Sequence, residues 1–113
     1  QIAKIIEKLQ RKPESKSATI TTLLVDDSGY IPCVSLLDFK IRNCALILTA
    51  SCRSLDVGKK MGANLIELVR LQKEVAGALS LPLGPLHLWI ASGHIYEKDK
   101  EHILKVIKEE NIL

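Results

Sequence analysis

The sequence is poor in aromatic residues, with one Phe, one Trp and two Tyr. Proteins that bind single-stranded nucleic acid stack bases on several aromatic rings, so this composition disfavours that class. The purely apolar runs are far shorter than the roughly 20 residues that span a bilayer, and no signal peptide is recognisable. We therefore expect neither a nucleic-acid partner nor a membrane partner.

Cysteine is also scarce. Cys33, Cys44 and Cys52 form an odd set without a C-x-x-C pair. Disulfide frameworks of secreted domains normally use an even number of cysteines. We expect reduced thiols, no metal site and a cytoplasmic protein.

The remaining composition fits one folded domain. Of 113 residues, 47% are hydrophobic and 26% charged, so the chain can bury a core. The net charge of +3 favours a phosphate-bearing small molecule over nucleic acid. The chain begins with Gln1 and not with Met, so we expect residues 1–113 to be a single domain within a longer product.

The first half of the chain changes periodicity several times. Helical spacing predicts a helix over residues 1–10, and β-branched residues predict a strand over 18–25 followed by a turn at 26–30. Residues 34–42 alternate, with Leu37, Phe39 and Ile41 on one side. Together with a strand over 46–54 they predict an antiparallel hairpin with one buried face.

The second half begins with a glycine-containing loop over 55–62 and a long helix over 63–80. An alternating strand over 86–96 and a charged amphipathic helix over 97–113 follow, the latter with Ile103, Leu104 and Ile107 facing inward. There is no repeat and no regular β-α-β alternation. The pattern indicates the α+β class.

Several polar residues stand at predicted strand ends and in the glycine loop, where active-site residues tend to lie. They are Cys33, Arg53, Ser54, Asp56, Asn64, His94 and Tyr96.

Each candidate also has a structural alternative. Cys33 is consistent with a buried structural thiol, since free cysteine is often buried. Asn64 opens the predicted long helix, where Asn is a favoured cap. The others could be a solvated strand end (Arg53 and Ser54), a turn (Asp56) or edges of the core (His94 and Tyr96).

Taken together and in order, these residues resemble the thymidylate synthase family. The segments that carry the resemblance are "IPCVSLLDFKIR", "LTASCRSLDVGKKMGANLIELVRLQKEVAGAL" and "ASGHIYEKD". They contain P-C, R-S-x-D-V, an Asn at the start of a long helix, and H-x-Y, at the family's spacing. "PESKS" at 13–17 is similar to the family's P-D-S-R-R element. The resemblance spans nearly all of the chain, whose composition suits a divergent archaeal member.

The resemblance implies a mixed or antiparallel sheet packed with helices, of which this chain would be a truncated core. It also implies a homodimer formed through the sheet. The implied activity is a methyltransferase of nucleotide biosynthesis that converts dUMP to dTMP. The implied cofactor is 5,10-methylenetetrahydrofolate or a methanopterin-type analogue, which supplies the one-carbon unit and the hydride.

The resemblance also implies a role for each candidate residue. These roles are the nucleophile that adds to C6 of the pyrimidine (Cys33), phosphate binding (Arg53 and Ser54), the loop against the pyrimidine (Asp56), recognition of the base (Asn64), and binding of the deoxyribose hydroxyl (His94 and Tyr96).

The chemistry of these side chains suits those roles. A thiol must ionise before it attacks, and a nearby arginine stabilises the thiolate, so Arg53 can serve both Cys33 and a phosphate. The Asn64 amide can donate to O4 of uracil and accept from N3–H. Cytosine presents the opposite pattern, so an Asp would be expected for dCMP, and the unpaired polar groups would reject the wrong base.

The sequence departs from the family at several points. The paired arginines that reach a partner's phosphate are replaced by Lys16 and Ser17, so we expect Lys16 to bind the nucleotide and the phosphate affinity to be lower. Val34 stands where many members have His, and Lys59 and Lys60 lie in a loop that is usually apolar. The family's N-terminal part and its C-terminal closing segment are not among these 113 residues.

Three hypotheses follow. The first is a thymidylate-synthase-type enzyme, with the 113 residues alone inactive. The second is a non-catalytic module that binds uracil nucleotides. The third is a purely structural dimerisation domain.

Overall fold

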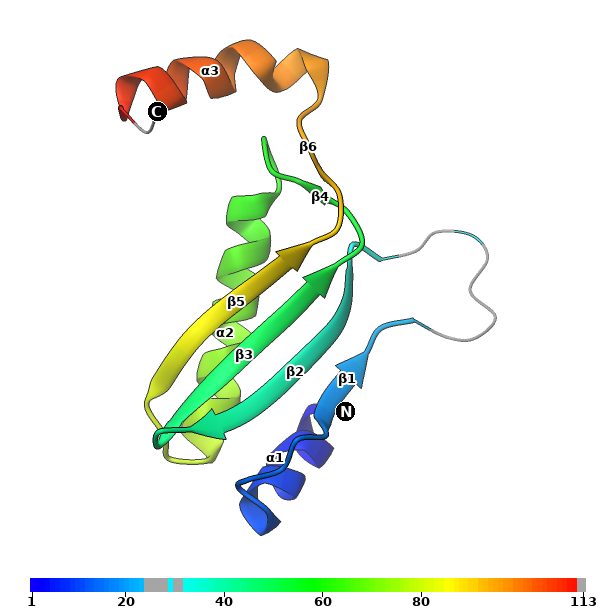
Figure 1. The fold of residues 1–113 in the computed structure, drawn as a ribbon, viewed down its shortest axis with the longest axis vertical. Helices are drawn as coiled ribbons and strands as arrows, with labels where there is room; N and C mark the ends of the chain where they lie inside the picture. The colour runs from blue at the N-terminus through cyan, green and yellow to red at the C-terminus, as the bar shows by residue number, and fades with distance from the viewer. Residues whose placement is uncertain (24–28, 30–31, 112–113) are drawn as a thin grey trace.

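A computed structural model describes residues 1–23, 29 and 32–111 (Figure 1). In chain order the elements are α1 (Ile2–Arg11), β1 (Ala18–Thr21), β2 (Val34–Arg42), β3 (Ala45–Cys52), β4 (Leu55–Asp56), α2 (Met61–Ala78), β5 (Leu83–Ile90), β6 (Gly93–His94), the 3-10 turn η1 (Glu97–Asp99) and α3 (Lys100–Glu109). Helices and a mixed sheet confirm the α+β class.

The main sheet has the strand order β1-β2-β3-β5. The pairs β1–β2 and β2–β3 are antiparallel, and β3–β5 is parallel. The predicted hairpin is β2–β3, and it turns at Asn43 and Cys44, whose φ angles are 52° and 58°. Two consecutive left-handed residues are typical of the tight turn that matches the twist of a hairpin.

One face of this sheet packs against α1 and α2 (Figure 1). Strand β3 sends every second side chain to this face, ending with Cys52. Ile5 and Leu9 of α1 and Val75 of α2 meet these strand residues in a single core. Each fully buried aliphatic side chain contributes roughly 1.5–3 kcal/mol. The opposite face of the sheet has no helix over it among the described residues.

Gln72 connects α2 to the sheet through side-chain hydrogen bonds. Its side chain is 2% exposed, and its Nε2 donates to the carbonyls of Leu46 and Gly84 at 3.0 Å each and to that of Pro85 at 3.3 Å. The strands also approach closely here, because a Cβ on Gly84 would lie 2.9 Å from the Leu46 carbonyl oxygen. The parallel strands β3 and β5 are thus held together at the end where β3 begins.

The predicted strand over 86–96 is wrong as a single element. Strand β5 begins earlier, at Leu83, and ends at Ile90, and β6 pairs with β4 in a separate two-stranded sheet. The pattern is broken because the chain changes its pairing partner: β5 pairs with β3, whereas the residues after it pair with β4. The first bond of the new pairing is the 3.0 Å hydrogen bond from the Leu55 N–H to the Ser92 carbonyl, beyond the end of β3. The predicted loop over 55–62 therefore contains β4 and the start of α2.

The connection from β3 to β5 is a parallel crossover through α2, a local β-α-β unit that the sequence did not predict. At β1, the strand ends at Thr21. The end of the predicted 18–25 strand, and all of the predicted 26–30 turn except Gly29, lie outside the described residues.

The inward packing expected for the last helix is also wrong. Helix α3 has no buried residue, and Leu104 is 54% exposed. Figure 1 shows α3 projecting beyond the end of the main sheet. Amphipathic spacing creates an apolar stripe, but no described element lies over it. Among the described residues, no helix has the length and apolar character needed to cross a membrane.

Candidate functional site

Cys33 and Arg53 meet at the end of the β2–β3 pair that lies away from the hairpin turn. Cys33 immediately precedes β2 and Arg53 immediately follows β3. The Arg53 backbone N–H donates a 2.8 Å hydrogen bond to the Cys33 carbonyl oxygen. The Cys33 side chain is half-buried and Arg53 is exposed. The strand pairing thus places a partly accessible thiol next to a cationic residue.

The three cysteines lie in different environments, and all are free thiols. Cys44 is exposed at the hairpin turn, and Cys52 is 3% exposed at the end of β3. Burial raises the pKa of the Cys52 thiol, and the negative charge of a Cys33 thiolate raises it further. Cys52 is therefore kept neutral, while Cys33 retains access to solvent.

Asp56 forms the turn that leads from β4 into α2. It is 5% exposed, and its Oδ1 accepts the backbone N–H groups of Gly58 and Lys59 at 3.1 Å each. A Cβ on Gly58 would lie 3.1 Å from Ile95 Cγ2 and 3.4 Å from that same Oδ1, so the turn is closely packed. The structural alternative for Asp56, a turn residue, describes its contacts correctly.

The pairing of β4 with β6 brings the H-x-Y pair to this turn. Asp56 is opposite His94 in the register, and the Val57 N–H donates to the His94 carbonyl at 3.0 Å. The His94 and Tyr96 rings are in edge contact, with centroids 5.1 Å apart. Tyr96 is 53% exposed, so these two side chains do not form a closed core edge.

Asn64 is not a helix cap. Helix α2 begins at Met61 with Lys60 as its N-cap residue, and the Asn64 N–H donates within the helix to the Lys60 carbonyl at 3.0 Å. The Lys60 N–H in turn donates to the Asp56 carbonyl at 3.0 Å. Asn64 thus lies in the first turns of α2, joined through Lys60 to the Asp56 turn, and its side chain is half-buried.

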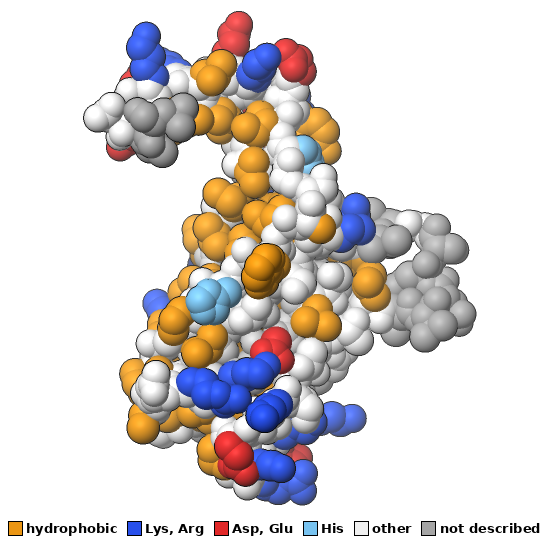
Figure 2. Space-filling view, in the orientation of Figure 1, with side chains coloured by type: hydrophobic (Ala, Val, Ile, Leu, Met, Phe, Trp, Pro, Cys, Tyr) orange, Lys and Arg blue, Asp and Glu red, His pale blue; other side chains and the backbone are white. Residues whose placement is uncertain are grey.

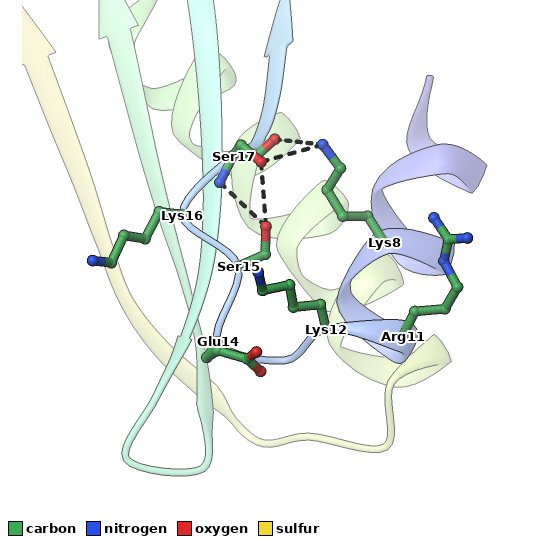
Figure 3. A pocket seen from close by; sticks show the side chains of 7 residues that line it. All are labelled: Lys8, Arg11, Lys12, Glu14, Ser15, Lys16 and Ser17. Carbon is green, nitrogen blue, oxygen red and sulfur yellow. Dashed lines mark hydrogen bonds between the residues drawn. The ribbon is translucent and has the colours of Figure 1, made fainter.

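The structure does not bring Lys16 to the other candidates. Lys16 lies in the connection between α1 and β1, and β1 starts at Ala18, which pairs with Phe39. Phe39 is six residues along the strand direction from Cys33, a separation of about 20 Å at 3.3 Å per residue. Lys16 instead lines a basic cavity with three residues that sequence reasoning missed, Lys8, Arg11 and Lys12 (Figure 3).

The missed residues had a signal in the sequence, because positions 8, 11 and 12 share one face of a helix.

The other candidates gather where β2 starts, β3 ends and β4 pairs with β6. This grouping combines a thiol, a guanidinium, a hydroxyl, a carboxylate, an amide and an imidazole–phenol pair. Such a set can attack an electrophilic carbon and bind a polar, anionic ligand. Within the described part of the chain, no group of His, Cys, Asp or Glu could hold a metal ion.

Comparisons with known proteins show the family of the chain. The family model described as Thymidylate synthase matches residues 1–112. Similar proteins named "Putative thymidylate synthase" occur in Methanosarcina acetivorans (38% identity, 96% of this chain and 51% of the relative), Methanosarcina barkeri (37%, 98% and 52%) and Methanothermobacter marburgensis (33%, 96% and 50%). The chain spans about half the length of the curated relatives it matches. By its match along nearly its whole length, this chain belongs to the thymidylate synthase family.

Proposed function

We propose that the protein containing this chain is a thymidylate-synthase-type methyltransferase that converts dUMP to dTMP, with Cys33 as the nucleophile. The observation that carries the proposal is the 2.8 Å hydrogen bond from the Arg53 N–H to the Cys33 carbonyl. It fixes the residue that bears the thiol beside the residue that bears a permanent positive charge. A thiol attacks carbon as its thiolate, and in the proposed reaction the Arg53 guanidinium would stabilise that form.

The remaining residues suit the other parts of dUMP. Arg53 and Ser54 are adjacent at the end of β3 and would bind the phosphate, for which a planar guanidinium is well shaped. Asn64 would read the O4 and N3–H of uracil. His94 and Tyr96, held in ring contact beside Asp56, would bind the deoxyribose hydroxyl. Lys16 precedes β1, whose start is about 20 Å from Cys33 along the strands, so it would contribute to the site of a second copy.

The proposed one-carbon donor is 5,10-methylenetetrahydrofolate or a methanopterin-type analogue, which supplies the carbon and the hydride when bound. Two residues near Gly58 would suit a flat, partly polar ring. Ile95 is 43% exposed and lies against Gly58, next to the Asp56 carboxylate. In this chain Ile95 would offer an apolar surface to such a ring, and Asp56 would keep the adjoining loop in place.

We propose that the chain forms a homodimer through the sheet face that no described helix covers. Figure 2 shows apolar side chains on this face among charged ones. Leu36, Leu83 and Trp89 are 37%, 43% and 71% exposed. Large apolar side chains grouped on a sheet face are typical of an interface. Sedimentation of the Trp89→Glu variant should show a shift towards monomer, and an unchanged dimer would argue against this face.

The decisive experiment uses the complete gene product and dUMP labelled with tritium at C5. Release of tritium in the presence of the donor should be lost in Cys33→Ala and retained in Cys44→Ala, since Cys44 is an exposed thiol at the hairpin turn. Release from Cys33→Ala at the wild-type rate would refute the nucleophile.

A uracil-nucleotide-binding module without turnover is the second candidate. Its supporting observation is that Ser17, where the resemblance expects an arginine, is neutral and hydrogen-bonded to Lys8. Binding of dUMP by the complete protein, without tritium release from the wild type, would favour this module over the enzyme.

A further inference from the structure

Two of the three free thiols lie at the same end of the main sheet. Cys52 is the last residue of β3 and pairs with Val34, the first residue of β2, and Cys33 directly precedes Val34. The N–H of Arg53, the residue after Cys52, donates to the Cys33 carbonyl at 2.8 Å. Cys33 and Cys52 are therefore diagonal neighbours across two adjacent segments. The proposed reaction uses Cys33 and leaves Cys52 without a role.

The backbone spacing allows a bond between these two sulfurs. Adjacent strands lie about 4.8 Å apart and rise about 3.4 Å per residue, so diagonal Cα atoms are about 6 Å apart. Disulfides join residues whose Cα atoms are roughly 4.4–6.8 Å apart. Cys44 lies at the hairpin turn, before the start of β3 and at its other end from Cys52. The third thiol is therefore too far away to be the partner of either.

The direction of the Cys33 side chain also permits the bond. Successive side chains of a regular strand point to opposite faces, which would turn Cys33 away from Cys52. Cys33, however, lies in a bend before β2, and the register of β2 with β3 is irregular between Val34 and Leu36. Strand alternation therefore does not fix its direction. After burial, the negative charge of a Cys33 thiolate is the second cause that raises the pKa of Cys52, so the two sulfurs lie within electrostatic reach of each other.

The two thiols differ in their access to solvent. Cys33 is half-buried, whereas Cys52 is 3% exposed. Cys52 is also held between two strands, since it pairs with Val34 on one side and with Ile90 of β5 on the other. An oxidant in solution therefore meets Cys33 first. An accessible thiol with a second thiol beside it is the arrangement of redox-sensitive cysteine pairs.

We infer that Cys52 is a resolving thiol for Cys33, and that a peroxide converts the pair to a disulfide. In the first step the Cys33 thiolate attacks one oxygen of hydrogen peroxide, so that an S–O bond forms, the O–O bond breaks and hydroxide leaves. In the second step the Cys52 sulfur attacks the Cys33 sulfur. The S–S bond forms, the S–O bond breaks, and the hydroxyl group leaves with the Cys52 proton as water. The two thiols lose two electrons in total, and the peroxide gains them.

The first step prepares the second. A sulfenic acid is uncharged, so oxidation of Cys33 removes the thiolate charge that opposes ionisation of Cys52. The disulfide then withdraws Cys33 from reaction reversibly, because a reductant restores both thiols. Without a resolving thiol, further peroxide converts a sulfenic acid to a sulfinic acid, which ordinary reductants do not restore. Cys52 thus protects the proposed nucleophile from permanent oxidation.

Mass spectrometry of the complete gene product after treatment with hydrogen peroxide tests the inference. We expect the wild type to lose two hydrogen atoms, to give a peptide pair linked through Cys33 and Cys52, and to recover both thiols in dithiothreitol. Cys52→Ala should instead gain oxygen at Cys33 as a sulfinic acid that dithiothreitol does not reduce. Cys44→Ala, which removes an exposed thiol, is the matched control and should behave as the wild type.

Oxygen gained at Cys33 in the wild type, without the Cys33–Cys52 peptide pair, would overturn the inference. Full recovery of the Cys33 thiol in Cys52→Ala would do the same. The inference needs only the Cys33 thiol and no turnover of dUMP, so it can fail separately from the proposed function. Tritium release without the linked peptides refutes the resolving thiol alone, and linked peptides without tritium release support the resolving thiol and count against the enzyme.

Discussion

The Cys33 carbonyl and the Arg53 N–H are joined by a 2.8 Å backbone hydrogen bond, although the two residues lie on opposite arms of the β2–β3 hairpin. The main chain thus holds the two residues together whatever their side chains are. Substitutions of the Arg53 guanidinium therefore test its chemistry without removing the contact that positions it.

Replacing Arg53 should reduce affinity for the nucleotide through its phosphate. We expect Arg53→Gln to weaken dUMP binding by about ten- to a hundred-fold, because a hydrogen bond to a charged group contributes about 1.5–3 kcal/mol. Calorimetric titration with deoxyuridine, which lacks the phosphate, is the control and should give the same affinity in both proteins. A parallel loss for deoxyuridine would show that Arg53 acts on the fold or on the base.

Replacing Asn64 should change which base is accepted. An aspartate at this position presents acceptors only when ionised, and it suits the amino group of cytosine better than O4 of uracil. We expect Asn64→Asp to weaken dUMP binding by about 1–3 kcal/mol, the cost of unpaired polar groups, and to improve dCMP binding. Because Asn64 is within α2 and is not its cap, thermal stability should change little. An unchanged preference for dUMP in competition titrations would remove Asn64 from the base site.

The buried thiol of Cys52 should make stability depend on alkaline pH. Its folded-state pKa is raised, first by burial and then by the Cys33 thiolate, so the folded state retains a proton that the unfolded state loses. The associated stability is complete below the unfolded-state pKa and is lost as pH rises through the folded-state value, from about pH 8 upward. Urea unfolding across this range should show a shallower decline in Cys52→Ala than in the wild type.

Cys33→Ser gives a second test of the same relationship. It removes the smaller cause of the shift and leaves burial in place, so the decline should begin at the same pH, which the unfolded-state pKa sets, but end at a slightly lower pH and be smaller in total. Identical pH profiles for wild type and Cys52→Ala would contradict the assignment to Cys52.

Two glycines provide a matched test of strand packing. A Cβ on Gly84 would lie 2.9 Å from the Leu46 carbonyl, whereas one on Gly77, in α2, would meet nothing within 4 Å. We expect Gly84→Ala to lower the free energy of unfolding by about 1–3 kcal/mol, as overpacking does. Gly77→Ala should raise it by about 0.5–1 kcal/mol through helix propensity. Chemical denaturation measures the free energy of unfolding of both variants. Equal effects would mean that β3 and β5 can move apart to accommodate the Cβ without loss of stability.

Local patterns predicted the elements whose structure depends on neighbouring residues. Helix α1, the β2–β3 hairpin and most of α2 follow from the spacing of apolar side chains, and Cys33, Arg53 and Ser54 stand beside strand ends as expected. The failures involve long-range partners. β5 and β6 form one continuous pattern in the sequence, but β6 pairs with β4 and so breaks from β5. The apolar stripe of α3 was correctly seen as amphipathic, yet no described element covers it.

The sequence by itself determined the family of this protein and the kinds of side chain available to its site, because residue types in order suffice for both. Tertiary structure alone decided which of them meet. It placed Asp56 opposite His94, joined Cys33 to Arg53, left Lys16 at the other end of the sheet, and turned Lys8 towards Ser17. The physical reason is that these contacts join segments far apart in the chain. Their geometry depends on strand pairing and on packing against a shared core, and short-range periodicity does not encode that geometry.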